Sequence, residues 1–284
     1  MAQDHEQTRR TIVITGASDG IGASAARDLA ATGHEVVLVG RSPDKTAAIA
    51  GELGAPSFVA DFADLAQVRD LAAQLADAYP HIDVLANNAG GIMGARTVTT
   101  DGHELTFQVN HLAPFLLTRL LLPTLVASGA SVIQTSSAAS RIFADYDPDD
   151  LETEQRYSER RAYGNAKLEN ILFTRELQRR HGDDGISAVA FHPGVVATNF
   201  GAESTPVMRA LYHTPVLNRL FTISPTRGAD QLVWLAEGRP GTDWEPGAYY
   251  VKRRRTRSPK GEDADLARRL WEDSLRLLCE AGPA

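Results

Sequence analysis

The sequence contains very little cysteine, and this shortage restricts the chemistry open to the chain. Cys279 is its sole cysteine, so neither an internal disulfide nor a zinc site built from several thiolates can form. The eight histidines are scattered without the spacing of metal ligands. We therefore expect no bound metal, and we expect the protein to reside in the reducing cytoplasm.

The chain also lacks an excess of basic residues and a long apolar run. Its 29 lysines and arginines face 36 acidic residues, which gives a formal net charge of -7 and argues against a dedicated nucleic-acid-binding protein. The longest apolar stretch, residues 112–126, is interrupted by Pro114, Arg119 and Pro123 and is shorter than the roughly 20 residues that span a bilayer. The polar first ten residues contain no signal-peptide core. We therefore expect no membrane anchor, no nucleic-acid partner and a small-molecule substrate.

Hydrophobic residues make up 43% of the 284-residue chain, which suits one globular domain over residues 1–284. Short β-branched runs alternate with longer segments of helical period, a pattern typical of a parallel sheet covered on both faces. The predicted strands are 11–15, 35–39, 57–60, 82–86, 131–135, 186–191 and 248–251. The predicted helices are one between the first two strands, then 64–79, 102–127, 160–181, 225–237 and 264–280. The fold class is α/β: a Rossmann-type, doubly wound, seven-stranded parallel sheet with helices on both faces.

Three segments depart from this rhythm. Residues 141–161 form a polar insertion with seven acidic residues. Residues 201–224 are predicted to act as a substrate lid, with apolar side chains at Val207, Met208, Leu211, Tyr212 and Leu217. The basic run 252–257 could contact an anionic partner or a lipid surface, although a solvated charged loop is the favoured interpretation.

A glycine-rich turn follows the first strand directly. Gly16, Gly20 and Gly22 lie between this strand and the first helix, where glycine allows a tight turn and a helix N-terminus attracts a pyrophosphate. Arg41 follows the second strand, at the position that faces the adenosine ribose. An arginine there can pair with a 2′-phosphate, so we expect NADP(H) rather than NAD(H).

Tyr163 and Lys167 lie four residues apart in a helical segment, and their side chains should therefore share a face. A nearby ammonium lowers the pKa of a phenol, so Tyr163 could exchange a proton with a substrate oxygen. Ser137, after the strand 131–135, could hydrogen-bond that oxygen, or it could only cap a turn. Asn110, within an apolar helix, is expected to hold a water or a backbone group in a proton relay.

In order along the chain, TGASDGIG (15–22), NNAG (87–90), Asn110, Ser136 with Ser137, Tyr163 to Lys167 and HPGVVAT (192–198) resemble the short-chain dehydrogenase/reductase family. The resemblance implies a catalytic tetrad of Asn110, Ser137, Tyr163 and Lys167. It also implies the following cofactor-binding residues: Gly16, Ser18, Gly20, Ile21, Gly22, Arg41, Asp61, Phe62, Asn88, Ala89, Gly90, Tyr163, Lys167, Pro193, Gly194, Val196 and Thr198. Among these, Asp61 would meet the adenine amino group, and Val196 with Thr198 the carboxamide. Family members commonly form homodimers or homotetramers through two long central helices.

The segment KLENILFTRELQRR and the ending LARRLWEDS are similar to the retinol dehydrogenase and WW-domain oxidoreductase branch, which favours NADP(H). We expect an NADP(H)-dependent oxidoreductase that moves a hydride between nicotinamide and a carbonyl or alcohol carbon of an apolar small molecule. Two alternatives stay open: an NADP-binding scaffold or sensor with negligible turnover, and an NAD-dependent alcohol dehydrogenase.

Overall fold

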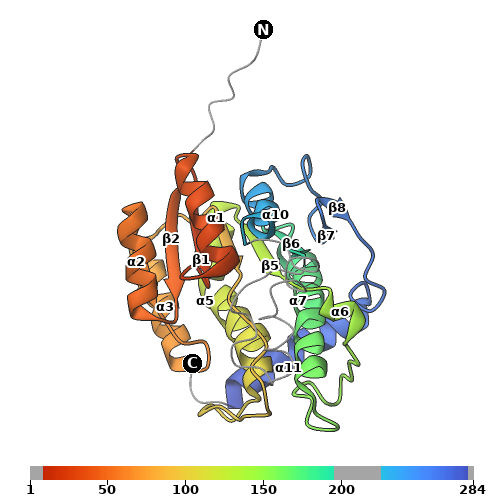
Figure 1. Ribbon diagram of the computed structural model, residues 1–284. Helices are drawn as coiled ribbons and strands as arrows, with labels where there is room; N and C mark the ends of the chain where they lie inside the picture. Colours follow the sequence, from red (N-terminus) through yellow and green to blue (C-terminus); the bar gives the residue numbers. More distant parts are fainter. Residues whose placement is uncertain (1–8, 195–224, 281–284) are drawn as a thin grey trace, which may run out of the picture.

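A computed structural model of the chain describes residues 9–194 and 225–280 (Figure 1). Its centre is one eight-stranded sheet with the order β3-β2-β1-β4-β5-β6-β7-β8. The strands are β1 (Thr11–Thr15), β2 (Glu35–Gly40), β3 (Ser57–Val59), β4 (Val84–Asn87), β5 (Ser131–Thr135), β6 (Ser187–His192), β7 (Tyr249–Val251) and β8 (Arg254–Arg255). The first seven pair in parallel, and β8 pairs antiparallel with β7. The predicted doubly wound sheet is confirmed, with β8 as a strand that the sequence pattern did not indicate.

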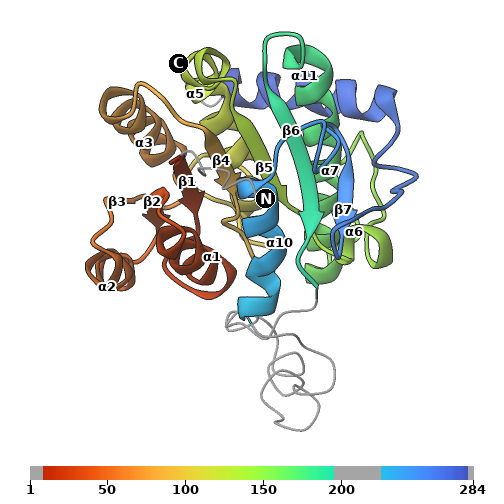
Figure 2. The same ribbon diagram turned by 90° about the horizontal axis from the view of Figure 1, so that it is seen from above.

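Helices cover both faces of this sheet (Figure 2). One face carries α1 (Gly20–Ala31), α2 (Pro43–Leu53) and α10 (Pro225–Glu237), and the other carries α3 (Leu65–Ala78), α5 (Ala113–Ser128) and α7 (Glu159–His181). Two helices were not predicted: α2 and the short α6 (Ala139–Ile142). The sequence nevertheless marks the ends of α2, because Ser42 caps its N-terminus and Gly54 ends it with a φ of 62°.

The central strands β1, β2, β4, β5 and β6 are buried on both faces, as near-continuous apolar runs predict. Along β1, Ile12 and Ile14 enter the core beneath α1 and α10, while Val13 enters the core beneath α5 and α7. Because neighbouring strands are parallel, they end at the same edge of the sheet, and the predicted site residues follow those ends.

The predicted helix 102–127 is divided into three parts. It begins as α4 (Leu105–Phe107), passes through a π-helical turn, η1 (Gln108–Leu112), and continues as α5. By length and composition Leu105–Ser128 could cross a membrane, but 56% of its most apolar window is buried within the fold. A buried core helix passes the same test, so this feature is weak support for a membrane span.

The C-terminal helix α11 (Ala264–Glu280) lies across α5 and α7 (Figure 1). Trp271 is 2% exposed, and its ring centroid is 5.0 Å from that of Phe115 and 5.8 Å from that of Phe173. The guanidinium of Arg180 lies 4.9 Å from the centre of the Trp271 ring. The helix therefore covers part of the two long helices through which subunits were expected to pack.

Candidate active site

The glycine-rich turn is built by close backbone contacts. Gly16 has a φ of 68°, in the left-handed region that favours glycine. A Cβ on Gly22 would lie 2.3 Å from the carbonyl oxygen of Gly16 and 2.8 Å from Nδ2 of Asn88, so only glycine fits there. Asp19 caps α1 by accepting a hydrogen bond from the Gly20 amide at 2.7 Å. The turn thus brings the N-terminus of α1 beside the segment that follows β4.

Thr15, which the sequence reasoning did not single out, joins these two segments. Its buried hydroxyl oxygen accepts hydrogen bonds from the amides of Asn88 and Ala89, both at 3.0 Å. Nδ2 of Asn88 donates in return to the Thr15 carbonyl at 3.0 Å. Ile21 is partly buried and packs against the core beneath α1. Since Thr15 is the last residue of β1, its position at a parallel strand end was the signal that could have revealed it.

The end of β2 carries the predicted ribose-recognition residue. Arg41 is exposed and follows Gly40 directly. A Cβ on Gly40 would lie 2.9 Å from Cβ of Ser18 and 3.0 Å from its Oγ, so the glycine lets the Ser18 hydroxyl approach the strand next to Arg41. The Ser18 hydroxyl therefore lies beside the residue that precedes Arg41.

Two further cofactor candidates follow β3. The carboxylate of Asp61 accepts a hydrogen bond from the Ala63 amide at 2.9 Å, while its own amide donates to Oε1 of Gln67 at 3.0 Å. Phe62 is 5% exposed, and its ring belongs to the core beneath α5. Any contact of Phe62 with a cofactor would therefore be made by its backbone.

Tyr163 and Lys167 lie on α7, and both are buried. Nζ of Lys167 is 5.5 Å from the centre of the Tyr163 ring and donates a hydrogen bond to the Thr135 carbonyl at 3.1 Å. Complete burial lowers the pKa of Lys167 to about 7. The amine can therefore change its protonation state near neutral pH, which suits a group that supports proton transfer.

Asn110 lies in the π-helical turn, and both polar atoms of its side-chain amide make hydrogen bonds. Its Oδ1 accepts from the Gly91 amide at 3.0 Å, and its Nδ2 donates to the carbonyls of Gly91 and Thr106, both at 2.9 Å. The predicted backbone-holding role of Asn110 thus has a geometric counterpart. A Cβ on Gly90, which has a φ of 149°, would lie 2.4 Å from Oδ1 of Asn110 and 3.1 Å from Nζ of Lys167. Gly90 therefore lets Asn110 and Lys167 approach each other.

The two serines after β5 have different hydrogen-bonding partners. Ser136 Oγ donates to the carbonyl of Lys167 at 2.6 Å, which ties the strand end to α7. Ser137 is partly exposed, and its Oγ accepts from the Ala139 amide at 3.2 Å, in the manner of a turn cap. A Cβ on Gly164 would lie 2.7 Å from the Ala144 nitrogen and 3.0 Å from the Ala139 carbonyl oxygen, so α6 packs directly on α7 beside Tyr163.

The last cofactor segment follows β6. Gly194 has a φ of 100°, and its amide donates to Nδ1 of His192 at 3.2 Å. Burial, assisted by the charge of Lys252, lowers the pKa of His192 to about 4, so this imidazole is neutral. Pro193 lies between them and is partly buried. Val196 and Thr198 lie outside the described residues, as does the predicted lid 201–224.

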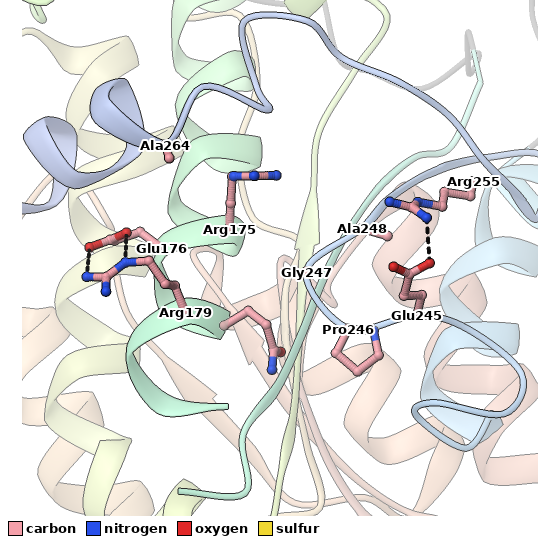
Figure 3. A pocket seen from close by; sticks show the side chains of 10 residues that line it. Arg175, Glu176, Arg179, Glu245, Pro246, Gly247, Ala248, Arg255 and Ala264 are labelled. Atoms are coloured by element: carbon pink, nitrogen blue, oxygen red, sulfur yellow. Dashed lines mark hydrogen bonds and ion pairs between the residues drawn. The ribbon is translucent and has the colours of Figure 1, made fainter. Parts of the chain in front are cut away.

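The basic run 252–257 forms the hairpin of β7 and β8 and continues beyond it. Arg253 pairs with Asp230, Arg255 with Glu245 at 2.8 Å and Arg257 with Glu262 at 3.1 Å. Arg255 also lines a pocket of about 270 Å³ with Arg175, Glu176, Arg179 and residues 245–248 (Figure 3). Gly247 and Ala248 lie before β7, at the opposite end of the parallel strands from the segments that follow β1, β4 and β5. This pocket is therefore separate from the Tyr163 site.

The assembled residues fit a dinucleotide cofactor. Gly16, Gly22 and Gly90 lie at a helix N-terminus and after the ends of β1 and β4, and they let these segments pack at distances that a Cβ would prevent. The buried Lys167 lies next to Gly90, and the buried Tyr163 lies next to Lys167. Together these features define a class of protein, the α/β oxidoreductases that use a nicotinamide dinucleotide.

The chain belongs to the short-chain dehydrogenase family. The sequence model of the family described as "short chain dehydrogenase" matches residues 10–208. A protein of Streptomyces sp. (strain C5) named "Putative daunorubicin C-13 ketoreductase DnrU" is 44% identical over 277 residues, covering 95% of this chain and 92% of that protein. Human retinol dehydrogenase 13 is 34% identical, covering 97% and 86%. The predicted resemblance to the retinol dehydrogenase branch is thereby confirmed.

Solved structures resemble the fold in the same way. A crystal structure described as a putative uncharacterized protein from Mycobacterium paratuberculosis superimposes with a TM-score of 0.73 at 33% identity, covering 94% of this chain and 92% of the other. The Pseudomonas aeruginosa RhlG/NADP active-site complex superimposes with a TM-score of 0.66 at 25% identity, covering 84% and 93%. The fold and family together establish that this chain is a short-chain dehydrogenase or reductase.

Proposed function

We propose that the protein is an NADP(H)-dependent carbonyl reductase or alcohol dehydrogenase in which Tyr163 acts as the acid or base. The observation that carries this proposal is the convergence of Lys167 and Asn110 at Gly90, with the Tyr163 ring centre 5.5 Å from Nζ of Lys167. A scaffold without turnover would have no need of a buried amine, since burying an ammonium is costly unless it is used or paired.

In the reducing direction, Tyr163 donates its phenolic proton to the oxygen of the substrate carbonyl as that oxygen gains negative charge. The glycine-rich turn and the segment after β4 would hold the nicotinamide cofactor, which would supply the hydride for the carbonyl carbon. The Ser137 hydroxyl hydrogen-bonds the same oxygen, and the ammonium form of Lys167, 5.5 Å from the Tyr163 ring, stabilises the phenolate that Tyr163 becomes. In the oxidising direction the phenolate takes the proton back from the alcohol.

The cofactor preference rests on the end of β2. Arg41 can supply a cation for a 2′-phosphate, and the Ser18 hydroxyl, which lies beside Gly40, can supply a hydrogen-bond donor. An acid at position 41 would accept hydrogen bonds from a 2′-hydroxyl instead. The RhlG complex contains NADP, which supports the same preference.

The substrate is proposed to be an apolar ketone or the corresponding alcohol. The Streptomyces relative carries the name of a ketoreductase, and the human relatives are named retinol dehydrogenases. Ile142, the last residue of α6, is 65% exposed, and Phe143, which follows it, is 41% exposed. These two side chains offer apolar surface to such a substrate.

The first test is a panel of ketones, aldehydes, quinones and retinoids with NADPH, followed at the absorbance of reduced nicotinamide. Turnover should fall by about 10²-fold or more in Tyr163→Phe, which removes only the hydroxyl group. Tyr79→Phe, which removes a hydroxyl at the end of α3, serves as the matched control. NADPH binding without turnover on any compound would favour the scaffold. Near wild-type turnover of Tyr163→Phe would exclude the acid/base role.

A second test compares the affinities for NADPH and NADH in the wild type and in Arg41→Asp. The ratio should move toward NADH by at least about tenfold, since a charge-assisted pair of roughly 1.5 kcal/mol or more is lost and a repulsion is gained. An unchanged ratio would show that Arg41 does not select the cofactor and would leave the NAD-dependent alternative in place.

We also propose that any homo-oligomer uses surfaces other than the part of α5 and α7 that α11 covers.

A further inference from the structure

The C-terminal helix α11 presents one serine to the core. Ser274 is completely buried, between the large side chains that anchor the helix, and its neighbour Trp271 packs on Phe115 and Phe173. A buried hydroxyl is costly unless it has a hydrogen-bonding partner. The partner of Ser274 therefore shows which part of the molecule the helix stabilises.

That partner is His111, which lies 163 residues away in the chain and next to Asn110. Nε2 of His111 and Oγ of Ser274 are 2.8 Å apart, and His111 is 1% exposed. Its ring lies among aromatic side chains, with centroid distances of 5.4 Å to Phe107, 5.9 Å to Phe115 and 6.3 Å to Phe173. Complete burial lowers the pKa of His111 to about 3, so the imidazole is neutral, and the hydrogen bond is one between uncharged groups. This hydrogen bond is a polar link between α11 and the π-helical turn.

The π-helical turn decides where Asn110 lies. In η1 the amide of Ala113 donates to the carbonyl of Gln108, five residues earlier, which inserts one residue into the helical ladder. This insertion places Asn110 where its amide reaches Gly91 and its Oδ1 lies next to Gly90 and Nζ of Lys167. If the turn relaxed to an ordinary α-helix, the residues after it would rotate by about 100°, and Asn110 would lose this register.

A π-helical turn is rare because its geometry is less favourable than that of an α-helix, and it persists where the surrounding structure holds it. The backbone of η1 is held on one side by the Asn110 contacts with Gly91. Gln108, at the start of the turn, accepts a hydrogen bond from Thr99 and donates to Asp101 and to the Phe62 carbonyl. At His111 the turn is held by ring packing and by the hydrogen bond to Ser274.

We propose that Ser274 and His111 are positioning residues that hold the π-helical turn in register, so that α11 helps to place Asn110 beside Lys167. The effect on turnover rests on the proposed reductase function, whereas the effect on the turn does not. The helix that closes the hydrophobic core thus also acts on the catalytic geometry.

The test compares Ser274→Ala, His111→Phe and the double variant, with Arg268→Ala as the control. Ser274→Ala removes one oxygen from the buried pair, while Arg268 is exposed on the same helix and pairs only with Asp265 among the described residues. Hydrogen–deuterium exchange of peptides covering residues 105–113 reports on the turn without any substrate. Exchange there should become faster in Ser274→Ala and stay unchanged in Arg268→Ala. With a substrate from the panel, kcat should fall by about tenfold, less than the 10²-fold that a misplacement of about 1 Å can cost, while KM changes little.

The double variant distinguishes positioning from general destabilisation. If Ser274 acts through His111, adding Ser274→Ala to His111→Phe should change neither kcat nor the exchange of 105–113 any further. The proposal is overturned if Ser274→Ala lowers only the melting temperature and leaves 105–113 at wild-type exchange, or if its effect is undiminished in the His111→Phe background. If the wild type turns over no compound, the reductase proposal fails alone, and the exchange data still decide this one.

Discussion

Glu169 on α7 gives a sharp prediction about stability, because it is a buried carboxyl group without a partner. It is 0% exposed, and neither carboxyl oxygen has a hydrogen-bonding partner within the described residues. Burial, followed by the negative charges of Glu104 and Glu152, raises its pKa well above the ordinary value. The folded protein therefore retains the Glu169 proton to a higher pH than the unfolded chain does.

The sign of the pH effect follows from this difference. Above the ordinary glutamate pKa of about 4.3, the folded state binds one proton more than the unfolded state, so stability falls as the pH rises toward the folded pKa. Its slope is about 1.4 kcal/mol per pH unit for one proton. Between pH 5.5 and 7.5 the wild type should therefore lose unfolding free energy relative to Glu169→Gln, which cannot ionise, and the loss for one whole proton is at most about 2.7 kcal/mol.

Urea unfolding at pH 5.5, 6.5 and 7.5 measures this difference directly. Glu176→Gln is the matched control on the same helix, because Glu176 pairs with Arg179 and Arg180 and has a lowered pKa in spite of its burial. Glu176→Gln should destabilise the protein at neutral pH, and this effect should diminish as the pH falls through the folded pKa. If Glu169→Gln and the wild type had parallel pH dependences, Glu169 would be ionised in the folded protein and the reasoning would be refuted.

Two further predictions follow from the site. Gly22→Ala should abolish NADPH binding or prevent folding, because its Cβ would lie 2.3 Å from the Gly16 carbonyl oxygen, and fluorescence titration measures the binding. The control Gly51→Ala places a Cβ with nothing within 4 Å and should stabilise α2 by about 0.5–1 kcal/mol, which calorimetry measures. Lys167→Met should remove a pH dependence of stability from the cofactor-free protein, because burial lowers the pKa of Lys167 to about 7. Between about pH 7 and 10 the unfolding free energy of the wild type should rise relative to that of the variant. If urea unfolding gave the same dependence on pH for both proteins, the lowered pKa would be contradicted.

The sequence predicted those parts of the structure whose signals are local. All seven parallel strands and the catalytic helix were predicted, with strand ends within two residues, because buried strands and helices carry strong apolar periods. Helix α2 was missed because it buries only Thr46 and so shows little amphipathic pattern. Strand β8 was missed because its two residues are exposed arginines that carry no strand pattern. The single-domain assignment, the cytoplasmic location and the lid stay predictions.

The site shows the same division between local and distant signals. Glycine spacing and the four-residue step from Tyr163 to Lys167 are visible in the sequence, because each is required by the geometry of one turn or one helix. The role of Thr15 depends on a strand end meeting the segment after β4, 73 residues away. The link from Ser274 to His111 depends on the path of the whole chain around α5 and α7. Family motifs therefore identify the groups that react, while the groups that position them are found only when distant elements are packed together.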